Sequence, residues 1–219
     1  RTEHKKIKEN KSELENVTSG IKTLARYIEQ KKQDIENQAQ EKQKIYKELE
    51  VQRAEYEKKI EQLEEASKQI ENMIRKLIRE RETKGGIIPK GTGSFIWPVK
   101  GRITSVFGYR RSPFSRRLSM HTGIDIANSH GFPIQAADNG EVIFSGWWDG
   151  YGKAVIIDHG KSISTVYAHL SRIYVEKGQM INKGQVLGLL GSTGFSTGPH
   201  LHFEVRKDGV PQDPLRWLP

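Results

Sequence analysis

The chain has 219 residues, with 36 lysines and arginines against 27 aspartates and glutamates, and it contains no cysteine. This length has room for one ordinary domain plus an elongated segment, or for two small domains. The lack of cysteine excludes a disulfide framework and a thiolate metal site, so a metal would need nitrogen and oxygen ligands. No apolar run approaches the roughly 18 to 20 residues that span a bilayer, and no signal peptide is visible.

Composition changes sharply along the chain. Residues 1–84 contain one glycine, Gly20, and no proline, whereas the remaining 135 residues contain 20 glycines and all 8 prolines. This contrast predicts a helical half followed by a turn-rich β half. Residues 86–219 carry 15 lysines and arginines against 9 acidic residues, a net charge of +6. Such a surplus favours an anionic partner such as nucleic acid, a membrane surface or a cell-wall polymer.

The N-terminal half has a seven-residue apolar period with one polar member. A period sustained this long predicts a coiled-coil helical arm over residues 1–84, with one continuous helix from Ile21 to about Glu82. The segment NVTSG, residues 16–20, could break the arm into a hairpin, but the apolar period passes through it undisturbed, so both forms stay open. The period consists of Ile7, Leu14, Ile21, Ile28, Ile35, Lys42, Leu49, Tyr56, Leu63, Ile70 and Leu77.

Two roles are open for this arm. It could be a spacer, dimeriser or regulatory element, or a solvated helix whose partner lies outside this chain.

A linker is predicted at residues 85–95, where Gly85 and Gly86 stop the helix. From residue 96 to residue 219, short alternating or β-branched runs are separated by glycine-containing turns. This pattern predicts an antiparallel β-sheet domain, so the expected fold is a long coiled-coil helix followed by an all-β domain.

Two segments of the β half place histidines and carboxylates together, because successive side chains of a strand point to opposite faces. In HLHFEV, residues 200–205, the two histidines and the glutamate share one face. In MHTGIDIA, residues 120–127, His121 and Asp125 share one face across a glycine. The residues expected on the opposite, core face are Thr122, Ile124, Ile126, Leu201, Phe203 and Val205.

Four histidines and Asp125 are therefore candidates for one site. His169 ends the β-branched run STVYAHL and joins His121, His200 and His202. Three nitrogen and oxygen ligands with a fourth position left for water are the pattern of a catalytic zinc site. Zinc acidifies water and polarises a carbonyl, and a nearby imidazole outside the ligand set can accept a proton or stabilise an oxyanion.

Other histidines and tryptophans are less informative. His4 lies on the charged helix, and His130 and His159 fall in turns, where exposed side chains are expected. Trp147 and Trp148 could line a groove or lie partly buried in the core.

A basic segment, RRSPFSRR, precedes the first histidine motif, with no acidic residue nearby. It could attract an anionic wall polymer or stem-peptide carboxylates, or it could be a solvated loop. Its arginines are Arg110, Arg111, Arg116 and Arg117.

The segments HTGIDIA, YAHL and STGFSTGPHLHFEV resemble, in this order, the signature segments of the M23 peptidases. These are the lysostaphin and LytM type zinc endopeptidases of bacterial peptidoglycan, and the resemblance covers residues 96–219. It implies one zinc ion per chain and hydrolysis of a stem-peptide cross-link or a bridge. It further implies that the zinc ligands are His121, Asp125 and His202. The unligated pair that activates water and stabilises the tetrahedral intermediate would be His169 and His200.

The resemblance also implies an extracytoplasmic place of action, in the cell wall, secreted or periplasmic. Peptidoglycan is the expected partner, and no binding of nucleic acid is expected. The arm could bind a protein partner or self-associate. If the arm is regulatory, a fragment that begins near Gly91 should cleave faster than the whole chain. The alternative function is a non-enzymatic activator of cell-wall amidases, since such activators share this plan but resemble degenerate members without metal ligands. All five site positions are present here, which favours the enzyme.

Overall fold

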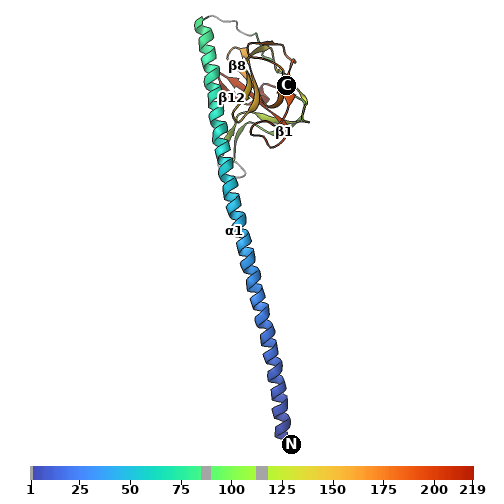
Figure 1. Cartoon of the computed structure of the whole chain (residues 1–219). Helices are drawn as coiled ribbons and strands as arrows, with labels where there is room; N and C mark the ends of the chain where they lie inside the picture. Colours follow the sequence, from blue (N-terminus) through green and yellow to red (C-terminus); the bar gives the residue numbers. More distant parts are fainter. Residues whose placement is uncertain (1, 85–89, 112–117) are drawn as a thin grey trace. The chain divides into compact units, whose positions relative to one another are not determined.

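The computed structural model describes residues 2–84, 90–111 and 118–219 (Figure 1). It has the predicted class, one long helix followed by an antiparallel β domain. No helix among these residues is long and apolar enough to cross a membrane. The elements are α1 (Thr2–Lys84), β1 (Arg102–Ser105), β2 (Gly108–Arg111), β3 (Leu118–His121), β4 (Ile124–Ala127), β5 (Pro133–Gln135), β6 (Gly140–Trp148), β7 (Gly152–Gly160), β8 (Ile163–Ile173), β9 (Met180–Ile181), β10 (Val186–Leu190), β11 (His200–Lys207), β12 (Val210–Gln212) and the 3-10 turn η1 (Pro214–Arg216).

Helix α1 runs without a break through Gly20, so the helical hairpin left open by the sequence does not form. Thr18 and Thr23 each donate their hydroxyl to the carbonyl four residues earlier, which is a bond of helix interiors rather than of helix caps. The apolar heptad side chains from Ile7 to Leu49 are exposed in this single chain. A coiled-coil partner for them stays a prediction.

The chain divides into two compact units, of which the second is Glu55–Pro219. This unit contains the last part of α1 together with the whole β domain. Residues 85–89 of the predicted linker lie outside the described residues. The predicted boundaries at residues 84 and 96 therefore stay predictions.

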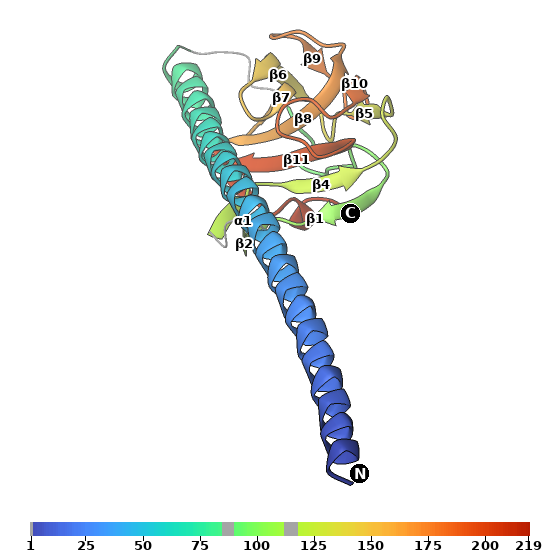
Figure 2. The same ribbon diagram turned by 60° about the horizontal axis from the view of Figure 1, so that its bottom comes forward.

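The large sheet positions three of the histidine segments side by side. Its strand order is β1-β4-β11-β8-β7-β6-β9, and all its pairs are antiparallel (Figure 2). Strand β10 pairs with β8 and β5, and β12 pairs with β11. Strands β2 and β3 form a separate two-stranded ribbon. Since β4, β11 and β8 are neighbours, residues far apart in sequence meet at one place on the sheet.

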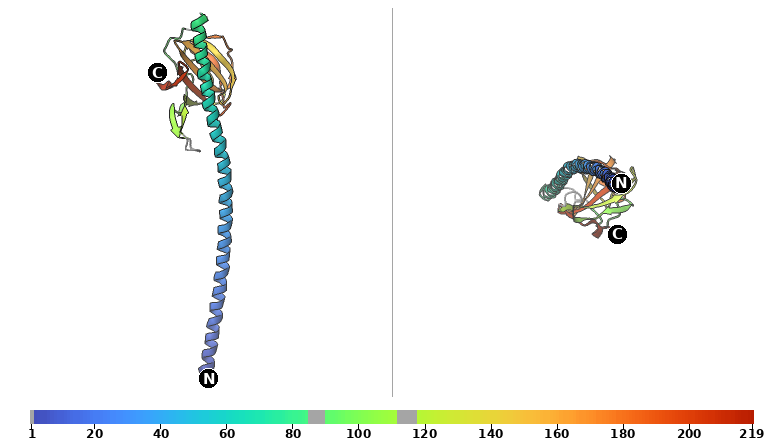
Figure 3. Two further views of the ribbon diagram at one scale, coloured as in Figure 1. Left: turned by 90° about the vertical axis from the view of Figure 1, so that its left-hand side faces the viewer. Right: turned by 90° about the horizontal axis from the view of Figure 1, so that it is seen from below.

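Each face of the sheet is covered by apolar side chains. One face carries the main core, which includes Ile124, Ile126, Leu201, Phe203 and Val205 as the alternation predicts. The other face is covered by the last part of α1 (Figure 3). The contact there joins Ala66, Ile70 and Ile74 of the helix to Ile143, Tyr151, Ala154, Ile156, Val166 and Ala168 of the strands.

The predicted exposure of His159 is wrong, whereas His130 is exposed as expected. The segment that enters the β domain lies across His159: Gly91 donates its N–H to the His159 carbonyl at 2.9 Å, and the Phe95 ring lies 5.3 Å from the imidazole. Nδ1 of His159 donates to the Asn139 carbonyl at 2.7 Å. Burial lowers the pKa of His159, so this histidine is a neutral part of the core.

Candidate metal centre

Three strand positions bring His121, Asp125 and His202 together. Asp125 of β4 and His202 of β11 are direct cross-strand partners, which places their side chains on the same face. His121 ends β3, and the turn to β4 passes through Gly123. A Cβ at Gly123 would stand 2.2 Å from the Phe203 carbonyl oxygen, so only glycine lets the turn approach β11 this closely.

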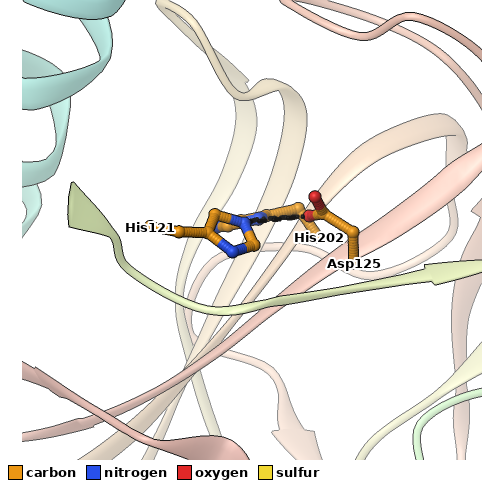
Figure 4. Close-up of side chains that lie close together, drawn as sticks. All are labelled: His121, Asp125 and His202. Carbon is orange, nitrogen blue, oxygen red and sulfur yellow. Dashed lines mark hydrogen bonds and ion pairs between the residues drawn. The ribbon is translucent and has the colours of Figure 1, made fainter. Parts of the chain in front are cut away.

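The polar atoms of these three side chains converge on one point (Figure 4). Nε2 of His121 lies 3.2 Å from Oδ1 of Asp125 and 3.2 Å from Nδ1 of His202. Nδ1 of His202 lies 2.8 Å from the same Oδ1. Ligands of a tetrahedral zinc, at about 2.0 to 2.2 Å from the metal, lie about 3.3 to 3.6 Å apart. The two imidazole nitrogens and the carboxylate oxygen therefore fit a metal ion after small side-chain movements.

The far nitrogen of each of these imidazoles is held by an acceptor. Nδ1 of His121 lies 2.8 Å from the Val106 carbonyl, and a carbonyl can only accept, so this nitrogen donates. Nε2 of His202 lies 3.0 Å from Oε1 of Glu204. These contacts leave Nε2 of His121 and Nδ1 of His202 as the nitrogens that could hold a metal.

The charges of the cluster also suit a cation. Burial alone would raise the pKa of Asp125, but its contacts with His121 and His202 lower it well below its usual range. Burial alone would lower the pKa of His202, but its contacts with Asp125 and Glu204 raise it to about 9. Asp125 is thus ionised at neutral pH, and a metal would displace a proton from His202.

His169 and His200 stand beside this cluster. Their ring centroids are 4.7 Å apart, and the His169 ring lies 6.0 Å from that of His202. Nδ1 of His169 donates to the Thr193 carbonyl at 2.7 Å, and Nδ1 of His200 donates to the Gly198 carbonyl at 2.8 Å. In each ring, Nε2 is then the nitrogen that can accept a proton.

His169 is held in an unusual conformation. Its φ angle is 63°, in the left-handed region that non-glycine residues rarely adopt. Its N–H donates to the Tyr151 carbonyl at 2.9 Å, and this bond helps to hold the strained backbone. Burial and the neighbouring histidines lower the pKa of His169 to about 3, so its imidazole is neutral near pH 7.

All five predicted site residues line one cleft of about 540 Å³. One wall of this cleft comes from α1 and the opposite wall from the strands and the loop that precedes β11. The helix residues of the wall are Ile60, Leu63, Glu64, Ser67, Lys68 and Glu71. The other lining residues are Arg110, Ser119, Met120, Thr122, Tyr151, Phe195 and Thr197, together with the four histidines and Asp125.

Thr122 and the arginines of the basic segment differ in how their predicted positions compare with the structure. Thr122 lines the cleft and donates its hydroxyl to Glu204, so its predicted core position is wrong, because the chain turns between β3 and β4 instead of continuing as one strand. Arg110 reaches the cleft and donates to the Ser105 hydroxyl, whereas Arg116 and Arg117 lie outside the described residues. The side chain of Arg111 lies outside them too.

The two tryptophans differ from each other. Trp147 is exposed. Trp148 is partly buried, with its ring 4.8 Å from that of Phe144. Trp148 therefore belongs to the core layer beneath α1.

Sequence reasoning assigned no role to Glu204 and did not single out Arg206, the two residues that support the site from behind. Glu204 and Arg206 are fully buried on the same strand face as His200 and His202. Tyr151 donates its hydroxyl to Oε1 of Glu204 at 2.8 Å. Strand alternation places Glu204 on the face of the histidines, as the sequence predicts, and the same alternation continued to residue 206 could have found the arginine.

Comparisons with known proteins identify the family of the β domain. Residues 119–214 match the model of peptidase family M23, so the β domain is a peptidase family M23 domain. The DD-carboxypeptidase/endopeptidase Mpg of Neisseria meningitidis is 44% identical over 132 residues, which cover 60% of this chain and 30% of that protein. A Lipoprotein NlpD/LppB homolog of Pseudomonas aeruginosa is 38% identical over 128 residues, which cover 58% of this chain and 40% of that protein.

A solved structure is similar as well. A zinc-containing peptidase from Vibrio cholerae is 35% identical with a TM-score of 0.52, and the match covers 57% of this chain and 39% of that one. The chain thus spans about a third of the length of curated relatives such as the Neisseria protein. The similarity therefore covers the β domain and leaves the larger part of such a relative's length unmatched.

Proposed function

We propose that this protein is a zinc-dependent endopeptidase that hydrolyses peptide bonds of bacterial peptidoglycan. The observation that carries the proposal is the convergence of two imidazole nitrogens and one carboxylate oxygen, with two further imidazoles in the same cleft. The names of the relatives add support, since one is a carboxypeptidase/endopeptidase and one is a zinc-containing peptidase. By the same comparison, we propose extracytoplasmic action on the cell wall.

In this proposal the zinc ligands are Nε2 of His121, Oδ1 of Asp125 and Nδ1 of His202, for one ion per chain. When bound, zinc supplies Lewis acidity, which polarises a peptide carbonyl and makes water more acidic. Val106 and Glu204 hold the two imidazoles in the required orientation. Three protein ligands leave room for water and substrate at the metal.

His169 and His200 are the proposed catalytic residues outside the ligand set. At neutral pH the His169 imidazole is neutral, and its Nε2 can take the proton of the attacking water. Once protonated, that Nε2–H can donate to the oxyanion of the tetrahedral intermediate and then return the proton to the leaving amine. His200 stands 4.7 Å away, ring to ring, and can share either task.

Hydrolysis of purified peptidoglycan sacculi tests this proposal. The full chain should contain about one zinc per molecule and should release soluble fragments, as zinc peptidases with three protein ligands do. His202→Ala and Asp125→Ala should lose both zinc and hydrolysis, while His130→Ala, at an exposed loop histidine, serves as the matched control. Retained cleavage in a metal-free His202→Ala protein would rule out the zinc mechanism.

Mass analysis of the released fragments identifies the bond, either a stem-peptide cross-link or a bridge. The same assay addresses the alternative function, an activator of cell-wall amidases. A protein that binds sacculi and releases nothing, but speeds an added amidase, would favour the activator. The complete set of four histidines and Asp125 in one cleft supports the enzyme.

The arm is proposed to regulate this activity or to bind a partner. The support is that α1 supplies one wall of the cleft, through residues such as Leu63, Ser67 and Glu71. The exposed apolar heptad positions nearer the N-terminus could bind a protein or a second copy of the chain.

A further inference from the structure

A buried chain of polar contacts runs from the metal centre to helix α1. Nε2 of His202 meets Oε1 of Glu204 at 3.0 Å, and Oε2 of Glu204 accepts from Nε of Arg206 at 2.6 Å. Arg206 then donates to Ser67 of the helix, from Nη1 to the carbonyl at 3.0 Å and from Nη2 to the hydroxyl at 2.8 Å. Two residues thus connect a candidate metal ligand with an element more than 130 positions away in the sequence.

Arg206 is fully buried, and each of its five N–H groups has an acceptor. Besides Glu204 and the two acceptors of Ser67, it donates to the Gly209 carbonyl at 3.1 Å and to the Tyr151 hydroxyl at 3.4 Å. Leaving N–H groups of a buried guanidinium without acceptors is costly. Two of its five donors depend on Ser67, so the orientation of the guanidinium depends on the position of α1.

Glu204 transmits this orientation to the metal centre. Its side chain is fully buried and accepts from His202, Tyr151, Thr122 and Arg206. A carboxylate facing Nε2 of His202 keeps a proton on that nitrogen and turns Nδ1 toward His121 and Asp125. If Arg206 moved, the carboxylate would lose its charge partner and the imidazole would lose its fixed orientation.

We propose that Arg206 is a positioning residue for the metal site, and that it strengthens metal binding through Glu204 as long as α1 is docked on the sheet. This inference rests on the proposed metal centre. Lysine cannot replace the arginine, because one ammonium group cannot reach Glu204 on β11, Gly209 in the turn to β12 and Ser67 on α1 at once. Helix α1 is therefore a part of the metal site's support as well as a wall of the cleft.

The test is the dissociation constant for Zn²⁺ of the full chain, measured by competition with a chromophoric chelator at fixed pH. Arg206→Lys should weaken zinc binding by about 10- to 100-fold, which is typical for loss of a group behind a metal ligand. Ser67→Ala should cause a smaller loss, because the Ser67 carbonyl still accepts. Ile70→Val is the matched control, since Ile70 is buried on the same helix face but belongs to the apolar layer.

Circular dichroism and thermal unfolding show which variants are folded. The proposal is overturned if folded Arg206→Lys and Ser67→Ala bind zinc as tightly as the unsubstituted chain, or if Ile70→Val loses as much affinity as Ser67→Ala. If Arg206→Lys does not fold, the zinc affinities of Ser67→Ala and Ile70→Val decide. Weaker zinc binding in Ser67→Ala than in Ile70→Val supports the proposal, and equal binding overturns it. Sacculus hydrolysis is measured separately: zinc affinity that depends on Ser67 without hydrolysis would refute the peptidase and leave this inference standing.

Discussion

At the level of single residues, the four imidazoles of the cleft differ in which ring nitrogen a hydrogen-bond acceptor engages. In each ring one nitrogen is engaged, which fixes the orientation and the nitrogen that is left for chemistry. Nε2 of His121 and Nδ1 of His202 lie within 3.2 Å of Oδ1 of Asp125, whereas Nε2 of His200 is 3.8 Å from it. The acceptors are the carbonyls of Val106, Thr193 and Gly198 and the carboxylate of Glu204.

This division predicts separable effects of histidine substitutions. His169→Ala and His200→Ala should keep about one zinc per chain and lower the rate of sacculus hydrolysis, by about 100- to 10,000-fold for loss of a general base. Metal analysis and initial rates on the same preparations measure both quantities. If either variant loses its zinc, the assignment of ligands and catalytic residues is wrong.

At the scale of elements, α1 contacts the hairpin between β11 and β12. The turn residues Asp208 and Gly209 have φ angles of 52° and 80°, as a two-residue hairpin of this kind requires. Nε of Arg75 donates to the Asp208 carbonyl at 3.2 Å. A Cβ at Gly209 would stand 2.8 Å from the Glu71 carbonyl oxygen, so the helix lies against the turn itself.

Substitution of Gly209 therefore measures the fit of the helix against this turn. Gly209→Ala should lower the free energy of unfolding by about 1–2 kcal/mol for the left-handed conformation, and by about 1–3 kcal/mol more for the clash with Glu71. Gly178→Ala is the control, because Gly178 has a φ of 88° and nothing within 4 Å of its added Cβ. Denaturant unfolding gives both values, and equal losses would mean that the helix is not tightly docked there.

At the scale of the whole molecule, the last part of α1 belongs to the same compact unit as the β domain, Glu55–Pro219. Ala66, Ile70 and Ile74 are almost fully buried against the strands. Removal of the helix would uncover strand residues such as Ile156 and Val166. The fragment that begins near Gly91, which the sequence suggests as a test of regulation, would therefore change stability as well as access to the cleft.

Two truncations separate these effects. A fragment of residues 55–219 should be monomeric and folded, whereas a fragment of residues 91–219 should be less stable and prone to associate, because it exposes the apolar face that the helix covers. Thermal unfolding and light scattering measure the difference. Equal stability of the two fragments would show that the helix is dispensable, and a rate comparison between them would then report regulation alone.

Much of the site could be predicted from local patterns. Strand alternation places His200, His202 and Glu204 on one face, and the spacing of His121 and Asp125 leaves room for an ion between them. Two failures have the same origin. Thr122 lines the cleft because the chain turns between β3 and β4, where its hydroxyl meets Glu204, and His159 is buried because the segment around Phe95 lies across it. No local pattern contains these contacts.

From the sequence alone, periodicity predicted the helix, turn residues predicted the β domain, and ligand types pointed to five residues that line one cleft, because these are local properties of the chain. For His121 and His169, the tertiary contacts set which nitrogen faces the cleft, since the acceptors, the Val106 and Thr193 carbonyls, come from other segments of the chain. Only the structure showed that α1 covers the second face of the sheet and bonds to Arg206, which contacts Glu204 behind His202. Those contacts depend on packing between elements. A heptad pattern predicts that a helix packs against something, but it does not identify the partner.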